Sequence, residues 1–147
     1  MIPAESVYAA FEAKQTVNAG LVEYTQRKVA SVRRLHRTSL PVPHVGGISG
    51  PKPLPHILGG LLAFESDWNP ALGKPLADAL SHTDRIGRLD LGCVAAHGIF
   101  ASDDSDGYVF SQGSKPATAF LLELIARLQA VATVPMIDIR AYTRWLA

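Results

Sequence analysis

The stretch that decides the fold is SVYAAFEAK at residues 6–14, followed by QTVN at residues 15–18. Apolar residues occupy every second position of the first segment, and Glu12 and Lys14 share the opposite face. This period of two predicts a strand with one apolar face and one mixed face. Strand geometry places Glu12 and Lys14 about 6.5–7 Å apart along the chain, on one side. We expect that side to be open to solvent or to a cleft.

Outward from this strand, apolar runs alternate with helical patterns. Helices are expected at residues 19–36, 75–81, 116–132 and 137–146, and strands at 57–64, 88–95, 98–101 and 108–111. Five prolines and three glycines among residues 38–56 predict an irregular loop. We expect this loop to border the same cleft as Glu12. The order of elements predicts one α/β or α+β domain over residues 1–147, with a mixed β-sheet flanked by helices.

Composition excludes several classes of protein. Of the 147 residues, 48% are hydrophobic and 18% are charged, which fits a packed domain and excludes intrinsic disorder. Glycine and proline interrupt every apolar stretch before the ~20 residues that a membrane span needs, so no membrane partner is expected. The first residues do not resemble a signal peptide. The single cysteine excludes an intrachain disulfide and a zinc cluster, and a cytoplasmic location is expected.

Charge is unevenly distributed along the chain. Six basic residues and no acid lie between Glu23 and Glu65, whereas eight acids and three bases lie from Glu65 to Asp106. Such segregation predicts a surface that faces a polyanion. The candidate nucleic-acid contacts are the arginines on or just after the first helix, Arg27, Arg33, Arg34 and Arg37. The alternative interpretation is that these side chains only solvate one face of that helix.

The Glu12–Lys14 pair is the sharpest candidate for chemistry. A carboxylate at this position can bind a hard cation such as Mg²⁺. A neighbouring lysine can orient or help to deprotonate an attacking water and offset phosphate charge. Asp90, on a later strand, is a second candidate metal ligand that could face the same side of the sheet. The alternatives are an ordinary surface ion pair for Glu12 and Lys14, and a solvated strand acid for Asp90.

An apolar strand that ends in Glu-x-Lys, continues as Gln-Thr and leads into a helix resembles the core of the restriction-endonuclease-like, PD-(D/E)XK nuclease superfamily. The segments PAESVYAAFEAKQTVN, LLAFESDW, LDLGCV and VPMIDIRAYTRWL also resemble an uncharacterised bacterial and prophage domain family that is assigned to the same fold. The resemblance implies a Mg²⁺-dependent nuclease centre in which Glu12 is a metal ligand and Lys14 is the catalytic lysine.

The chain departs from that superfamily at its start. The superfamily places an essential Asp on the strand before the Glu-x-Lys strand, and only five residues precede Ser6. We therefore expect an N-terminally shortened nuclease fold with weak or absent cleavage. We also expect an exposed sheet edge, through which the chain could form a homodimer. The alternative function is a non-catalytic module of a phage or defence system that binds nucleic acid or protein.

Overall fold

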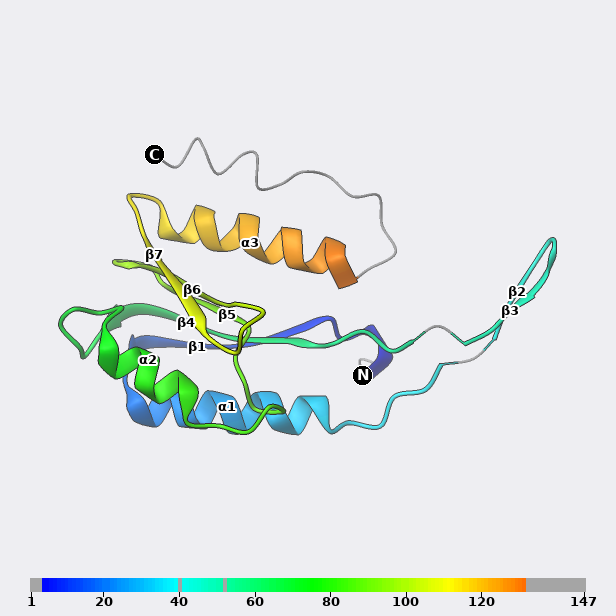
Figure 1. The fold of residues 1–147 in the computed structure, drawn as a ribbon, viewed down its shortest axis with the longest axis horizontal. Helices are drawn as coiled ribbons and strands as arrows, with labels where there is room; N and C mark the ends of the chain where they lie inside the picture. Colours follow the sequence, from blue (N-terminus) through cyan, green and yellow to red (C-terminus); the bar gives the residue numbers. More distant parts are fainter. Residues whose placement is uncertain (1–3, 40, 52, 132–147) are drawn as a thin grey trace.

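The computed structural model describes residues 4–39, 41–51 and 53–131 (Figure 1). The elements in chain order are η1 (Ala4–Ser6), β1 (Ala9–Val17), α1 (Ala19–Arg33), β2 (Val42–His44), β3 (Gly47–Ser49), β4 (Leu58–Ser66), α2 (Lys74–Ser81), β5 (Leu91–Val94), β6 (Gly98–Ser102), β7 (Tyr108–Gln112) and α3 (Pro116–Val131). The helix expected at residues 137–146 lies outside the described ranges. Among the described helices, none has both the length and the apolar character needed to cross a bilayer.

A mixed five-stranded sheet in the order β1-β4-β5-β6-β7 forms the centre of the molecule. Strands β1, β4 and β5 are parallel, and β6 and β7 continue the sheet in antiparallel fashion. Helices α1 and α2 cover one face and α3 covers the other (Figure 1). The expectation of an α/β fold with a mixed sheet between helices is therefore confirmed. In the described part of the sheet, β1 and β7 are the edge strands.

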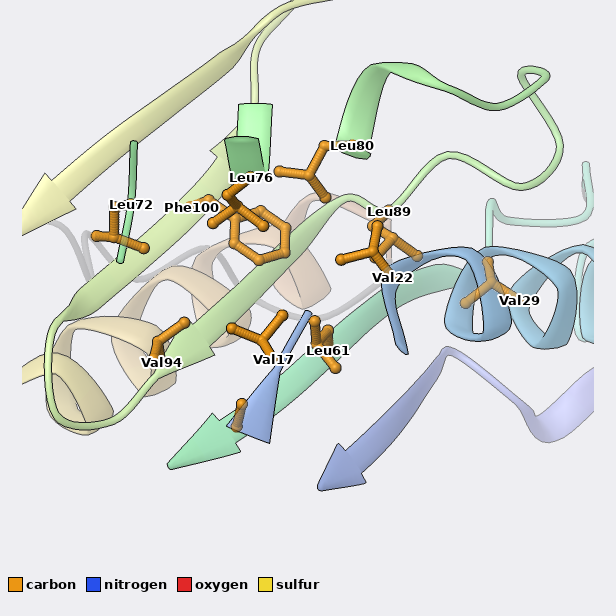
Figure 2. Close-up of a cluster of buried hydrophobic side chains, with 11 residues drawn as sticks. Val17, Val22, Val29, Leu61, Leu72, Leu76, Leu80, Leu89, Val94 and Phe100 are labelled. Atoms are coloured by element: carbon orange, nitrogen blue, oxygen red, sulfur yellow. The ribbon is translucent and has the colours of Figure 1, made fainter. Parts of the chain in front are cut away.

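Two apolar clusters hold these layers together. The larger cluster lies between the sheet and the α1–α2 layer, and Figure 2 shows its members Val22 and Val29 of α1, Leu61 of β4 and Phe100 of β6. The smaller cluster joins Phe120 of α3 to the other face, where Cys93 is buried. Burying one such aliphatic or aromatic side chain contributes about 1.5–3 kcal/mol. The burial of Cys93 also raises the pKa of its thiol.

The paired glycines of β4 allow the close approach of its neighbours. A Cβ atom on Gly59 would lie 2.3 Å from the Val29 side chain of α1. A Cβ atom on Gly60 would lie 2.1 Å from the Leu91 carbonyl oxygen and 2.4 Å from the ring of Phe11. All three distances are shorter than any ordinary packing contact. The glycines therefore mark where α1, β1 and β5 all press against β4.

The boundaries of several elements differ from the sequence-based expectations. The first strand begins at Ala9 instead of residue 6 and continues to Val17. Residues Ala4–Ser6 instead form a short 3-10 helix. Helix α1 ends at Arg33, three residues before the expected end. The predicted alternation of side chains within the strand is confirmed, because a change in where the strand begins or ends does not alter which residues share a face.

The region expected to be an irregular loop beside Glu12 forms a different structure. Strands β2 and β3 pair as an antiparallel hairpin, with His44 opposite Gly47 at the turn. Figure 1 shows this hairpin as an arm that projects away from the sheet at the end where β1 begins. The expectation that these residues border the site is therefore wrong. Glycine at position 47, with a φ of +139°, allows the tight turn that the proline-rich composition concealed.

Candidate active site

Glu12 and Lys14 lie together on one face of the edge strand β1. In the parallel ladder Glu12 is the partner of Leu61 and Lys14 is the partner of Ala63, and both partners belong to the cluster beneath α1. The Lys14 Nζ lies 3.3 Å from the Glu12 Oε1. The Lys14 side chain is 55% exposed and that of Glu12 is 24% exposed. The expectation of a shared, accessible face is therefore confirmed.

The turn after β1 fixes where α1 begins. The Asn18 side chain accepts a hydrogen bond of 3.0 Å from the Leu21 N–H, which caps the helix. The Asn18 amide also donates to Asp67 Oδ2, just after β4, at 2.9 Å. Because both parallel strands end at this point, the cap ties the helix to the same edge of the sheet that carries Lys14. Helix α1 thus returns alongside β1 from a fixed origin.

Arg33 does not occupy the position expected of a nucleic-acid contact. Its side chain is only 6% exposed and donates hydrogen bonds of 2.7–2.9 Å to the carbonyls of Ile57, Ile86 and Arg88. It also forms a 2.5 Å ion pair with Asp90. Burial lowers the pKa of Arg33 from its ordinary value, and attraction to Asp90 opposes that shift. Arg33 therefore joins α1 to the start of β4 and the approach to β5, and leaves no surface for a phosphate.

Asp90 is likewise engaged, so its expected role as a metal ligand does not fit the structure. Its carboxylate is 14% exposed and accepts hydrogen bonds from Arg33 and from the Gly59 N–H, the latter at 2.6 Å. The His56 Nε2 lies 3.1 Å from the other carboxylate oxygen. A carboxylate that already balances a buried arginine cannot turn to a cation without leaving that charge unpaired. Sequence could not show this partner, which lies 57 residues away.

Of the remaining predicted arginines, Arg27 and Arg34 lie at the surface and Arg37 is partly buried. Arg27 is 3.9 Å from Glu23, and Arg34 is 3.9 Å from Asp84, with the arginine side chains 70% and 63% exposed. Both line a groove between α1 and the segment that follows α2. Arg37 donates a 2.8 Å hydrogen bond to the Pro55 carbonyl at the base of the β2–β3 arm. The structure thus does not bring the four arginines together with Glu12 and Lys14.

Of the two predicted metal ligands, Glu12 is the one whose carboxylate remains available to a metal ion. Among the described residues, no three histidine, cysteine or acidic side chains converge on one point. Within that same part of the chain, the Glu12 carboxylate makes an ion pair with Lys14 and has no other charged partner. The sequence did not predict a second polar pair: the Glu65 carboxylate at the end of β4 lies 2.8 Å from the His97 Nε2. Both of its members are about 40% exposed and are paired with each other.

Comparisons with known proteins identify close homologues. The chain is 64% identical over 147 residues to the endodeoxyribonuclease NucC of Pseudomonas aeruginosa, and 64% identical over 148 residues to that of Escherichia coli strain MS 115-1. These matches cover 99% and 100% of the chain, which spans 61% of the length of each relative. No protein-family model matches the chain.

Solved structures of the same relatives share the fold. The apo form of E. coli MS115-1 NucC superimposes with a TM-score of 0.85 at 63% identity, covering 99% of this chain and 65% of that one. The cAAA-bound form of P. aeruginosa ATCC27853 NucC gives a TM-score of 0.86 at 64% identity, covering 99% of this chain and 61% of that one. These findings correct two expectations. The relatives are named nucleases and not members of an uncharacterised family. They also give no support to the expected loss of a strand or of cleavage.

Proposed function

We propose, from the premise that close homologues of this chain are endodeoxyribonucleases, that it is part of a nuclease of the PD-(D/E)XK type that hydrolyses DNA phosphodiester bonds. The observation that carries the assignment of residues is the Glu12–Lys14 pair on the α1-facing side of the edge strand β1, where Lys14 is more than half exposed. In an α/β sheet an exposed polar pair at a strand edge, beside a buried apolar cluster, is well placed to meet a ligand that approaches from solvent.

The two side chains have distinct roles in this proposal. Hydrolysis forms a bond between a water oxygen and phosphorus while the bond to the leaving oxygen breaks, and negative charge develops on the phosphoryl oxygens. The Lys14 ammonium, more than half exposed, orients the water and offsets that charge. Glu12 holds Lys14 in place through their ion pair in the absence of substrate. A positive group fixed before substrate arrives needs little reorganisation during the reaction.

Mg²⁺ is the proposed cofactor, and the residues present fit it. Glu12 offers a hard oxygen ligand that is partly exposed, and Mg²⁺ is usually held by one or two carboxylates together with substrate phosphates and water. When bound, the ion would supply Lewis-acid polarisation of the phosphate and a more acidic water. Asp90 is not part of this proposal, because Arg33 occupies its carboxylate.

DNA is the proposed partner, in a cytoplasmic setting. The outer edge of β1 has no strand beside it among the described residues, and an unpaired edge supports self-association of two copies. The second candidate function is a module that binds nucleic acid without cleaving it. That candidate is favoured by the surplus of basic residues between Glu23 and Glu65. Basic residues attract nucleic acid whether or not the protein also cleaves it.

The test is cleavage of supercoiled plasmid and of a labelled DNA duplex with Mg²⁺ or Mn²⁺, with and without added cAAA. Glu12→Gln and Lys14→Met are each expected to lower the rate by about 10²–10³-fold, because each removes a charged group aimed at the transition state. Arg34→Ala is the matched control, since Arg34 is exposed and lies on the other flank of α1. Cleavage that survives both substitutions would overturn the assignment. Metal-independent DNA binding without cleavage would favour the binding module.

A further inference from the structure

The two flanks of helix α1 have different surroundings. Its buried stripe, which contains Val22 and Val29, packs on the sheet. One flank faces α2: the Gln26 side chain donates to the Ala79 and Leu80 carbonyls, and Arg27 and Arg34 border the groove beside it. Because α2 lies over the β5–β6 side of the sheet, the opposite flank of α1 faces the β1 edge.

Tyr24 and Lys28 lie on that opposite flank. Successive helix residues are about 100° apart around the axis, so Lys28 is turned away from Arg27 and from the buried position 29 toward the β1 side. Tyr24 precedes Lys28 by one turn and shares its flank. The Lys28 Nζ lies 5.3 Å from the centroid of the Tyr24 ring, so the two side chains form one cation–π pair. Tyr24 is 37% exposed and Lys28 is exposed.

The pair also lies at the level of the candidate site. Helix α1 runs back along β1 from its cap at Asn18 to Arg33, which bonds to the Ile57 carbonyl at the start of β4 (Figure 1). A helix rises about 1.5 Å per residue and a strand about 3.3 Å. Tyr24 therefore lies at about the level of Lys14, and Lys28 at about the level of Glu12. The contact of Val29 with Gly59, the partner of Ala10, places Lys28 within about two strand residues of Glu12.

The basic side chains on the two flanks of α1 also differ in their neighbours. Arg27 has Glu23 within 3.9 Å and Arg34 has Asp84 within 3.9 Å. In the described part of the chain, the Lys28 ammonium has the Tyr24 ring as its neighbour and no carboxylate. An ammonium without a carboxylate partner keeps its full charge available to an anion, and a neighbouring tyrosine offers a flat ring that can lie against a sugar or base.

We infer that Tyr24 and Lys28 bind the DNA backbone beside the Glu12–Lys14 pair: the Lys28 ammonium contacts a phosphate, and Tyr24 holds Lys28 in place and packs against the adjoining nucleotide. This inference rests on the proposed function and assigns the nucleic-acid contact to the flank opposite Arg27 and Arg34. Lys28 acts on binding and not on the chemical step, because the reacting phosphate is assigned to Lys14.

Neighbouring residues of equal charge provide the test. Binding of a fluorescein-labelled DNA duplex to the full chain is followed by anisotropy in EDTA, across about 50–200 mM NaCl. Lys28→Ala is expected to flatten the log–log salt slope by about 0.9. The ratio of its Kd to the wild-type Kd should therefore change about 3-fold over that range. Arg27→Ala is the matched control and should retain the wild-type slope. Lys28→Arg should also retain it, and Tyr24→Leu should weaken binding more than Tyr24→Phe.

The outcomes separate this inference from the proposed function. If Lys28→Ala raises the KM for cleavage with little change in kcat while Arg27→Ala changes neither, the inference is supported. If the wild type binds and cleaves DNA but Lys28→Ala and Arg27→Ala behave alike, the inference is overturned and the proposed function stands. If Arg27→Ala alone flattens the slope, the contact lies on the α2 flank. If the wild-type chain neither binds nor cleaves DNA, the proposed function fails, and this inference fails with it.

Discussion

Two charged clusters at opposite ends of the β1–β4 pair are built in contrasting ways. At one end Arg33 is buried and donates four hydrogen bonds to three carbonyls and to Asp90. Nearer the other end, Lys14 is exposed and has Glu12 as its charged neighbour. Nearly all the hydrogen-bond donors of Arg33 have partners within the protein, whereas the exposed Lys14 ammonium can still bind an external ligand. The difference teaches that a charged residue close to a proposed site is a binding residue only if its partners leave it free.

The largest expected effect lies at the buried end. Arg33→Ala should lower the free energy of unfolding by about 3–5 kcal/mol, because it leaves the largely buried Asp90 carboxylate without its arginine partner. Arg33→Lys should not restore stability, since an ammonium cannot reproduce the planar fork that meets several acceptors at once. Urea denaturation followed by far-UV circular dichroism measures the change.

Arg34→Ala is the control for that measurement, because Arg34 is adjacent in sequence but exposed. Its substitution should change the unfolding free energy by less than about 0.5 kcal/mol. Equal stability of the Arg33 and Arg34 variants would show that the buried hydrogen bonds do not stabilise the fold, and the contrast between the two clusters would disappear.

An intermediate effect is expected at Gly60, between the two clusters. A Cβ at this position would lie 2.1 Å from the Leu91 carbonyl oxygen and 2.4 Å from the Phe11 ring, so the strands must move apart to accept it. Gly60→Ala should cost about 1–3 kcal/mol of unfolding free energy, as overpacking commonly does. Gly50→Ala, where the new Cβ meets nothing within 4 Å, is the matched substitution and should be nearly neutral.

The smallest effect on stability is expected at the open end. Glu12→Ala and Lys14→Ala should each change the unfolding free energy by about 0–1 kcal/mol, because the pair is partly exposed and screened by solvent. The same two substitutions should strongly reduce cleavage, so stability and activity separate at this end. A loss of stability as large as that of Arg33→Ala would mean that the pair holds the fold together, and its assignment to catalysis would lose its main support.

Much of the sheet could be predicted from the sequence, because apolar periodicity is a local signal. The strand containing Glu12 and Lys14 and the faces of its residues follow from alternation alone. The β2–β3 arm was missed because proline and glycine are read as loop formers, although they also permit a short hairpin. The long-range pairing of the strands into one sheet depends on contacts that no local pattern contains.

Only part of the candidate site could be predicted from the sequence. The burial of Arg33 did have a signal: it follows Val29 by four residues and therefore lies on the buried stripe of α1. The identity of its partner Asp90 had none, because 57 residues separate them. The flank that carries Tyr24 and Lys28 can be read from the helical period, but which flank faces β1 depends on the position of α2.

Cys93 is a built-in chemical probe of opening motions in the molecule. It is the single thiol of the chain, buried in the central strand β5 and with a raised pKa. The Cys93 thiolate attacks disulfide reagents such as Ellman's reagent, so labelling requires the α3-covered face of the sheet to open and expose the thiol to water. The half-life of labelling therefore reports how often the contact between α3 and the sheet opens, and one mass increment per chain marks each opened molecule.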